Sequence, residues 1–338
     1  MKKILIISVS LFFSLTLCAQ SVALHRNGET QVFRGMNAFI DANNAAQNGD
    51  TLYLSGLNFN GGDIYFDKSL KIYGVGSFDT ATAATGKTYV DGSIRLRQGA
   101  DDFHIEGVNF NNLSVVNNNS VNNLTVKRCY LSGSISFGTT ENPSEDFLLT
   151  GSVINGSVSL TNTIHPRVTN NIINGRIVTT KNVITNNIIL GNVNYNTIEG
   201  SDNILLNNYL TRAYGGYTSR ITGNNGNEFY YNVFEHSSPT LGTNYISENN
   251  EFDVSMRDFF VKKVVNAYNI EDDYHLQNPE IYIGEDGTQV GIYGGDYPYK
   301  EWAIPVIPYI ESVDIPFKVD EDGNLPVNVK VSAQKEQD

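Results

Sequence analysis

The sequence predicts an all-β fold, a right-handed parallel β-helix (solenoid) in which the chain winds into stacked coils, and three observations support this. Six positions recur, each three residues after an apolar strand residue, at intervals of 23, 19, 16, 21 and 24 residues, about one solenoid turn. Between residues 124 and 195 each is followed by two apolar residues and then by a Gly-x-apolar-x segment. Charge is low, and Gly and Asn are abundant, which suits many tight turns between short strands.

The recurring positions predict a structural ladder inside one corner of the solenoid. The ladder residues are Cys129, Ser152, Asn171, Asn187, Asn208 and Asn232, and their apolar partners are Val126, Leu149, Val168, Ile184, Leu205 and Phe229. We expect Asn at such a bend because it tolerates the left-handed backbone better than other non-Gly residues. Its amide also donates and accepts, so stacked amides keep a buried corner hydrogen-bonded. The ladder indicates architecture and says nothing about activity.

Residues 1–20 have the features of a bacterial secretory signal peptide. Lys2 and Lys3 precede a mostly apolar run over residues 4–13, which is too short for a typical membrane span. We expect cleavage just before or after Gln20 and an exported product, secreted or at the cell surface, with the periplasm as an alternative. Cys18 raises the alternative of a lipid anchor, but Leu17 stands where a lipobox needs a small residue.

Loss of the signal peptide leaves 21 basic and 36 acidic residues, a net charge of −15. Such a surface repels phosphate backbones and anionic lipids, which argues against nucleic acid or unaided membrane binding. Neutral glycans, cations and basic proteins remain as partners. Cys129 is then the only cysteine, so we expect no intrachain disulfide and an inert, buried thiol.

Residues 21–250 are assigned to the β-helix with its N-terminal cap. After a strand over residues 22–25, the spacing of Met36, Phe39, Ile40 and Ala46 predicts a helix, followed by a turn and a strand over residues 51–54. Early rungs are expected at residues 70–75 and 103–108. A helical cap is needed because an open solenoid end exposes core and unpaired strand edges.

The second strand of each coil is expected to present a polar flat face. By the period of two, the apolar residues at its centre point inward, and the small or polar residues beside them point outward. The inward residues are Ile135, Val158, Ile177 and Val193. Arg176 is the one charged residue on this face between residues 134 and 195.

Residues 251–338 are assigned to a C-terminal, β-rich capping segment that covers the end of the solenoid. Residues 253–265 fit a helix or a last strand, and we favour the helix. Residues 315–319 and 327–331, joined by residues 320–324, predict a hairpin.

The Asn-rich rungs, the stretch NGDTLYL at residues 48–54 and the stretch EDGTQVGIYGG at residues 285–295 resemble secreted right-handed β-helix proteins of Bacteroidetes-type bacteria. That group is largely uncharacterised and belongs to the pectate-lyase-like superfamily. The superfamily includes pectate and chondroitin lyases, polygalacturonases, phage tailspikes and adhesins. The resemblance therefore implies a β-helix that faces glycans, and it does not select a reaction.

The polar flat face lacks the groups that glycan-cleaving enzymes need. A uronate lyase uses a strong base beside carboxylates or Ca²⁺, and a glycosidase uses two carboxylates across the scissile bond. Two acidic clusters lie elsewhere, Asp101, Asp102 and His104, and Asp272, Asp273 and His275. We interpret both as solvated turns, because a metal site would need further ligands that the spacing does not supply.

No metal and no cofactor is therefore expected. Asp320, Asp322 and Asn324 have the spacing of a Ca²⁺ loop, but a hairpin turn explains them more simply.

The sequence offers one candidate ligand-binding stretch. Arg212, Tyr214, Tyr217 and Arg220 flank a Gly pair and would supply aromatic faces and guanidinium donors for sugars, with Tyr230 and Tyr231 one coil further on. The alternative is that these tyrosines seal the end of the core.

We expect a secreted, monomeric, non-enzymatic β-helix that binds extracellular or surface glycan or serves a structural role. The alternative is a polysaccharide lyase that uses the loop near Arg212 and Arg220.

Overall fold

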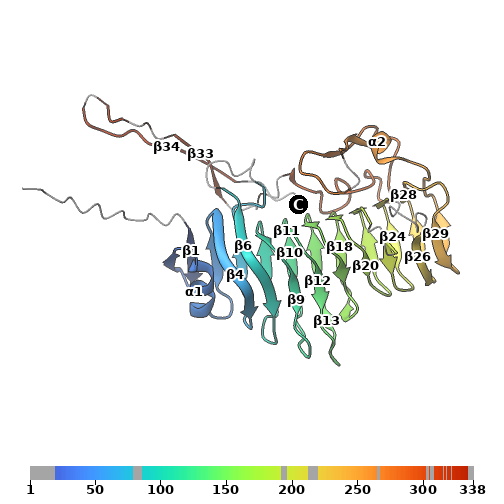
Figure 1. The fold of residues 1–338 in the computed structure, drawn as a ribbon, viewed down its shortest axis with the longest axis horizontal. Helices are drawn as coiled ribbons and strands as arrows, with labels where there is room; N and C mark the ends of the chain where they lie inside the picture. Colours follow the sequence, from blue (N-terminus) through green and yellow to red (C-terminus); the bar gives the residue numbers. More distant parts are fainter. Residues whose placement is uncertain are drawn as a thin grey trace, which may run out of the picture.

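The computed structural model describes residues 20–78, 86–191, 196–211, 220–264, 267–301, 304, 308–314, 316, 318–320 and 322–333. They form a parallel β-solenoid of about eight turns, seen in Figure 1 as a row of stacked strands. This confirms the all-β, parallel β-helix predicted from the sequence. Within the described residues, no helix has the length and apolar character needed to cross a membrane.

Two large sheets wind around one core. The 12-stranded sheet contains, in spatial order, β2 (Glu29–Arg34), β1 (Ser21–Arg26), β3 (Thr51–Leu54), β5 (Lys71–Tyr73), β7 (His104–Glu106), β10 (Thr125–Lys127), β14 (Leu148–Thr150), β18 (Arg167–Thr169), β21 (Val183–Thr185), β24 (Ile204–Leu206), β27 (Glu228–Tyr230) and β30 (Ile246–Glu248). We call it the first face.

The 14-stranded sheet supplies the other two faces. The second face contains β8 (Asn109–Phe110), β11 (Tyr130–Leu131), β15 (Val153–Ile154), β19 (Ile172–Ile173), β22 (Ile188–Ile189), β25 (Tyr209–Leu210) and β28 (Val233–Phe234). The third face contains β9 (Leu113–Val115), β12 (Ile135–Phe137), β16 (Val158–Ser159), β20 (Ile177–Val178) and β23 (Ile198–Glu199). The long strands β4 (Leu57–Phe66) and β6 (Thr88–Leu96) join the two faces.

The parallel register stacks equivalent residues of successive coils. On the first face, Val126 pairs with Leu149, Leu149 with Val168, and the row continues through Ile184, Leu205 and Phe229. All six are buried, and so are Ile135, Val158 and Ile177 on the third face, as the period of two predicts. Val193 lies outside the described residues.

The six ladder residues are fully buried, but the backbone reason given for them was wrong. The left-handed conformation belongs to the residue before each one, with φ of 52° at Arg128, 60° at Gly151, 58° at Asn170, 54° at Asn186, 58° at Asn207 and 53° at Tyr231. A strand that turns onto the second face thus needs one left-handed residue, and the next residue directs its side chain into the corner.

The corner between the second and third faces depends on glycine. A Cβ on Gly175 would lie 2.3 Å from the carbonyl oxygen of Gly156, and one on Gly156 would lie 2.6 Å from that of Gly133. The stacked backbones approach too closely for a side chain, which explains the Gly two residues before each of the strands β12, β16 and β20.

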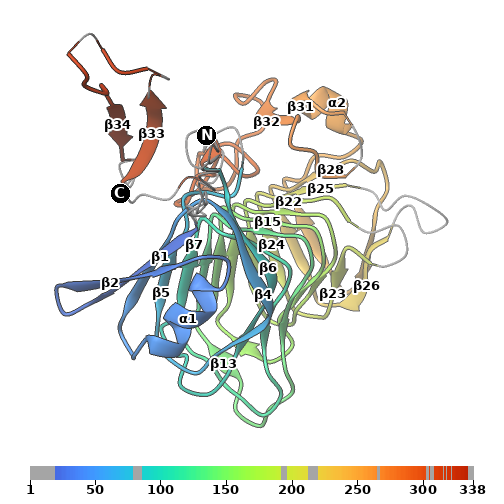
Figure 2. The same cartoon turned by 60° about the vertical axis from the view of Figure 1, so that its left-hand side comes forward.

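The N-terminal end is formed by the antiparallel pair β1–β2 and by α1 (Ala38–Ala45). Phe39 of α1 is fully buried, and its ring lies 5.8 Å from that of Phe66. Figure 2 shows α1 in front of the first coils. The predicted helix over residues 36–46 is thus present with shorter bounds.

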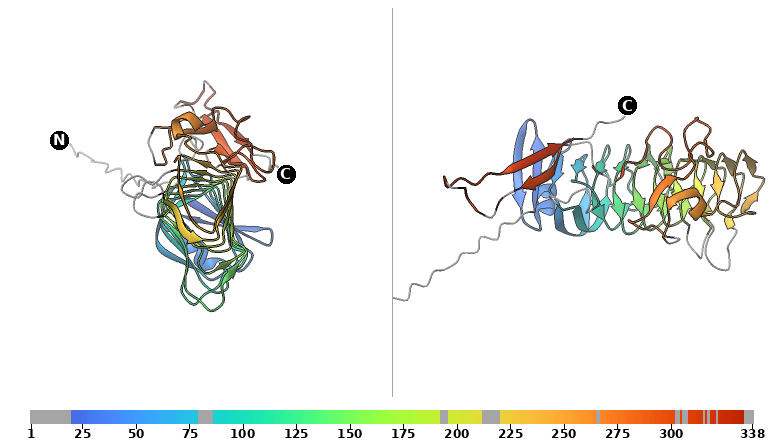
Figure 3. Two further views of the ribbon diagram at one scale, coloured as in Figure 1. Left: turned by 90° about the vertical axis from the view of Figure 1, so that its right-hand side faces the viewer. Right: turned by 90° about the horizontal axis from the view of Figure 1, so that it is seen from above.

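The C-terminal segment lies beside the solenoid, not over its end as we expected. Its first part contains α2 (Met256–Phe259), β31 (Phe260–Lys262) and β32 (Asp273–Leu276), so residues 253–265 hold both a short helix and a strand. Seen along the solenoid, it occupies one side of the coils (Figure 3). It covers an outward apolar row of the second face, which includes Val153, Ile172, Ile188, Tyr209 and Val233.

Four two-stranded sheets complete the described structure, and one of them pairs β31 with β32. The other three are β13 (Ser144–Glu145) with β17 (Thr163–Ile164), β26 (Arg220–Asn225) with β29 (Thr240–Thr243), and β33 (Tyr309–Asp314) with β34 (Asn328–Ser332). The hairpin β33–β34 begins earlier than the predicted strand over residues 315–319. Its connection is therefore longer than the turn of residues 320–324.

Candidate functional site

Left-handed asparagines of the solenoid hold the C-terminal segment in place. Asn170 Nδ2 donates to the carbonyl oxygens of Ile292, at 2.9 Å, and Gly294, at 2.6 Å. Asn207 Oδ1 accepts a hydrogen bond from the backbone N–H of Glu285 at 3.0 Å. Because these bonds fix both ends of the stretch 285–294, the segment has a defined position against the second face.

A buried ion pair between Lys263 and Asp272 fixes the other part of the segment. Both side chains are almost completely buried, and Asp272 also accepts bonds from the Val264 N–H at 2.7 Å and the Tyr274 hydroxyl at 3.1 Å. Burial lowers the pKa of Lys263, and its pairing with Asp272 opposes that shift. The interpretation of Asp272 as part of a solvated turn was therefore wrong.

A pocket of about 320 Å³ lies between the segment and the second face. Five aromatic rings line it, together with four acidic residues. The rings are Phe78, Tyr268, Tyr274, Tyr293 and Tyr299, and the acidic residues are Glu271, Asp272, Asp273 and Glu301. Its volume lies at the lower end of the range of about 300–1,000 Å³ that is typical of ligand pockets.

The tyrosine rings are ordered relative to one another. Tyr268 and Tyr274 are parallel, with centroids 6.3 Å apart, and Tyr293 and Tyr299 are perpendicular at 6.0 Å. Burial raises the pKa of all four phenols, so they stay protonated near neutral pH. Among the described residues, no group hydrogen-bonds the hydroxyl of Tyr268 or Tyr299, which leaves both available to a ligand.

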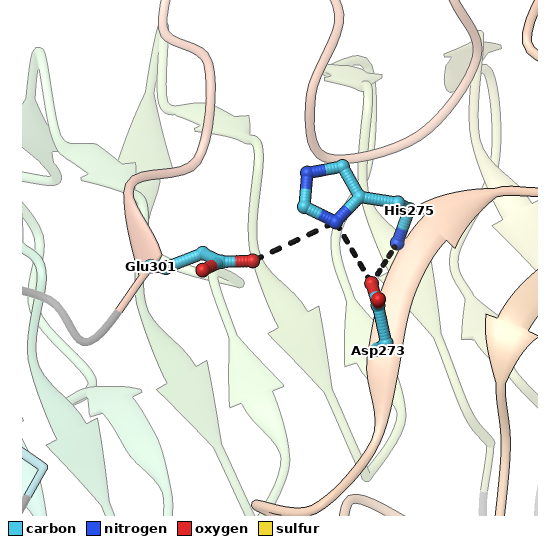
Figure 4. Close-up of side chains that lie close together, drawn as sticks. All are labelled: Asp273, His275 and Glu301. Carbon is cyan, nitrogen blue, oxygen red and sulfur yellow. Dashed lines mark hydrogen bonds and ion pairs between the residues drawn. The ribbon is translucent and has the colours of Figure 1, made fainter. Parts of the chain in front are cut away.

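Asp273, His275 and Glu301 meet at the rim of this pocket (Figure 4). Strand β32 alternates, so Tyr274 and Leu276 are buried while Asp273 and His275 share the opposite side. His275 Nδ1 lies 2.8 Å from Asp273 Oδ1 and 3.6 Å from Glu301 Oε1. Hydrogen bonds from His275 lower the pKa of Asp273, against the opposing effect of burial.

Neighbouring groups hold these three side chains. The His275 ring stacks on Tyr293, with centroids 4.1 Å apart and an 8° interplanar angle. The Tyr293 hydroxyl donates to Glu301 Oε1 at 3.4 Å. The Asp273 carboxylate also accepts the backbone N–H of His275 at 3.0 Å. The cluster is thus built on a strand and an aromatic ring, and it is partly exposed.

The predicted ligand-binding stretch contributes no described residue to the lining of this pocket. Arg212, Tyr214 and Tyr217 lie outside the described residues, and so does the side chain of Arg220, whose backbone begins β26. Tyr230 donates its hydroxyl to Glu228 at 2.9 Å, and Tyr231 occupies a left-handed corner. Neither of these two tyrosines lines the pocket, and a ligand role for the stretch stays a prediction.

The acidic cluster around His104 belongs to the coil contacts. Asp101 Oδ1 accepts the backbone N–H of Asn122 at 2.7 Å, and Asp102 is a left-handed turn residue with φ of 59°. His104 Nε2 lies 3.2 Å from Glu106 Oε2, and Glu106 forms a buried ion pair with Arg128 at 2.5 Å. These contacts give the residues of the cluster a structural role within the solenoid.

Asp320 behaves as a turn residue. Its Oδ1 accepts the backbone N–H groups of Asp322 at 3.0 Å and Asn324 at 2.7 Å.

Cys129 is a free, buried thiol. Burial raises the pKa of this thiol to about 12, so it is inert near neutral pH.

A second, wider groove of about 610 Å³ lies on the first face. Its lining mixes polar and charged residues with three apolar ones. The residues are Asn123, Thr125, Asp146, Leu148, His165, Pro166, Arg167, Lys181, Asn182 and Val183. None of these described lining residues is Phe, Tyr or Trp, so the groove lacks the large stacking surfaces of the pocket.

Sequence reasoning missed the pocket, although the tyrosines gave a signal. Six of the 19 tyrosines fall between residues 268 and 299. Glu301 was missed as well, because it is 26 residues from His275 in the sequence and only the fold brings the two together.

Comparisons of the chain with protein-family models, curated proteins and solved structures found no match.

Proposed function

We propose that this protein is a secreted, non-enzymatic β-helix that binds a saccharide in the tyrosine-lined pocket. The observation that supports the proposal is the pocket of about 320 Å³ with its five aromatic rings and with the hydroxyls of Tyr268 and Tyr299, which no described residue hydrogen-bonds. Rings of this kind stack on the apolar faces of sugars, and the hydroxyls bond sugar hydroxyls. The resemblance to glycan-facing β-helices and the N-terminal signal peptide agree with an extracellular ligand.

The charge of the pocket favours a neutral saccharide. Asp272 is neutralised by Lys263, but Glu271, Asp273 and Glu301 add negative charge to the lining. A uronate would approach this rim against like charge. We therefore expect neutral sugars to bind more tightly than uronic-acid sugars to the metal-free protein.

A glycan array followed by calorimetry tests the proposal. Tyr268→Phe and Tyr299→Phe keep each ring and remove its hydroxyl, and each should weaken saccharide binding by about 2–10-fold. Tyr53→Phe is the matched control, because Tyr53 is an exposed tyrosine of β3 that does not line the pocket. Its affinity should equal that of the wild type.

The same measurements test the ligand-binding stretch that the sequence predicts near Arg212 and Arg220. A Tyr214→Ala and Tyr217→Ala pair that abolishes binding, while the two pocket variants bind normally, would place the ligand near Arg212 and Arg220. Absence of saccharide binding across neutral and acidic panels would reject the function itself.

A polysaccharide lyase is the second candidate, and the first-face groove favours it. Arg167 and Lys181 could neutralise or deprotonate a uronate, with Asp146 and His165 in the same lining. Incubation with uronic-acid polysaccharides, followed by ultraviolet absorbance of unsaturated products, tests this. Turnover that Lys181→Met removes would support the lyase and contradict a binding-only protein.

A further inference from the structure

We propose that Asp273, His275 and Glu301 bind one divalent transition-metal ion, best represented by Zn²⁺, at the rim of the tyrosine-lined pocket. The ligand atoms are one nitrogen, His275 Nδ1, and one oxygen from each carboxylate. All three lie within 4.8 Å of one another. The proposal concerns the ion itself and holds whether or not a saccharide binds.

The distances between the ligand atoms suit a shared ion. Zn²⁺ lies about 2.0–2.1 Å from nitrogen and oxygen ligands, so two ligands of one tetrahedral or octahedral ion are about 2.9–3.4 Å apart. The observed separations from His275 Nδ1 are 2.8 Å to Asp273 and 3.6 Å to Glu301. The carboxylate oxygens lie within 4.8 Å of each other, and rotation of these partly exposed side chains would bring both onto one ion.

The ligands are positioned before any ion arrives. The strand β32 places Asp273 and His275 on one side, and stacking on Tyr293 fixes the plane of the imidazole. The Tyr293 hydroxyl holds Glu301 on the facing loop. Outer groups that orient metal ligands in this way are a regular part of metal sites, and they lower the ordering cost of binding.

The donor set distinguishes between classes of ion. Imidazole suits Zn²⁺, Ni²⁺ and Cu²⁺, whereas Ca²⁺ and Mg²⁺ prefer shells made of oxygen alone. Three protein ligands leave at least one coordination position open. His275 and Glu301 are both about half exposed, so water or a ligand can reach that position.

One consequence rests on the proposed function. A bound Zn²⁺ would neutralise the two carboxylates of the rim and present an open coordination position next to the aromatic rings. The pocket would then accept a carboxylated saccharide, whose carboxylate completes the coordination shell. Metal loading would thus change the preferred ligand from a neutral to an acidic sugar.

Calorimetry on untagged, chelator-treated protein tests the ion site without any saccharide. Titration with ZnCl₂ should give one site per chain, with CaCl₂ binding at least 10-fold more weakly. His275→Ala and Glu301→Gln should each weaken the Zn²⁺ site at least 10-fold. His25→Ala is the control, because the His25 ring lies on β1 and hydrogen-bonds Thr30, and it should bind as the wild type does.

Nitrogen NMR of the histidine rings identifies the ligand atom directly. Zn²⁺ should shift Nδ1 of His275 and leave the other rings unchanged. Equal Zn²⁺ affinity in wild type and His275→Ala, or an unshifted His275 ring, would overturn the site and leave a histidine that pairs with two carboxylates.

The saccharide arm is read separately from the ion arm. Binding of a carboxylated sugar only in the presence of Zn²⁺ supports the consequence for ligand choice. Zn²⁺ binding with no effect on any saccharide would retain the ion site and reject that consequence.

Discussion

Asn170 and Asn171 are consecutive in the chain, yet their amides bond on opposite sides of one corner. Asn171 Nδ2 donates into the solenoid, to Leu149 O at 2.9 Å and to Asn187 Oδ1 at 3.1 Å. Asn170 Nδ2 donates to Ile292 O and Gly294 O of the C-terminal segment. The pairs Asn186–Asn187 and Asn207–Asn208 repeat the arrangement. One dipeptide therefore stacks the coils and also attaches the segment that forms the pocket.

Replacing Asn170 separates these two roles. Glycine adopts the left-handed φ of 58° without strain, so Asn170→Gly should keep the corner and lose both bonds to the segment. We expect faster amide hydrogen exchange across residues 285–295 and little change in the solenoid strands.

Asn118→Gly is the control for that experiment. Asn118 is an exposed left-handed residue with φ of 60°, and no bond of its side chain to the C-terminal segment is present in the described structure. Equal exchange rates across residues 285–295 in the two variants would contradict the docking role of Asn170.

Asn187→Leu tests the ladder. Asn187 Nδ2 donates to Val168 O at 2.9 Å and Thr185 O at 2.8 Å, and its Oδ1 accepts the backbone N–H of Asn171 at 3.0 Å. Each buried group left unpaired costs about 1–3 kcal/mol, so the free energy of unfolding should fall by about 3 kcal/mol or more. Chemical denaturation measures it, with the exposed Val183→Ser on the same coil as a control expected within about 0.5 kcal/mol of wild type.

Two Arg–Glu pairs that bridge successive coils should differ in their contribution to stability. Glu106→Gln leaves the Arg128 guanidinium buried without its carboxylate, which should cost about 3–5 kcal/mol. Glu199→Gln breaks the partly exposed pair with Arg176 and should cost less than about 1 kcal/mol. Similar losses in the two variants would show that the Arg128 site admits water.

Asp50 predicts a pH dependence at the N-terminal end. Burial opposes its ionisation, but bonds from Arg26 and the Gln47 N–H hold its pKa below the ordinary 3.8. Since the pKa is lower in the folded state, the stabilisation is complete above the unfolded value. It is lost as the pH falls below 3.8 through the folded value.

Denaturation of wild type and Asp50→Asn at pH 7 and at about pH 2.5 measures this dependence. Wild type should be the more stable at pH 7, and the difference should shrink in acid. A constant difference would mean that Asp50 does not titrate in this range.

The sequence predicted the solenoid because its signals are local and repeat once per coil. Each ladder residue follows its apolar partner by three positions, and the stacking of Asn171 on Asn187 follows from that spacing. The left-handed residue was assigned one position too late, because Asn occupies both positions in pairs such as Asn170–Asn171. The spacing of the two asparagines does not show which of them adopts the left-handed conformation.

The position of the C-terminal segment beside the solenoid was harder to predict, although the sequence contains a signal for it. Each coil has two adjacent apolar residues after the ladder position, such as Ile172 and Ile173, and a strand can bury only one of them in the core. Ile173 enters the core, so Ile172 requires a cover from elsewhere. The cluster of Asp273, His275 and Glu301 depends on how that cover folds, which no repeat encodes.

The unequal spacing of the ladder residues has a consequence for how the sequence of such a solenoid can evolve. Consecutive rungs are separated by as few as 16 and as many as 24 residues, while the amides remain within bonding distance. Insertions and deletions are absorbed in loops away from that corner. Loop lengths can therefore change during evolution, and binding surfaces on those loops can be gained or lost, while the cross-section of the solenoid stays the same.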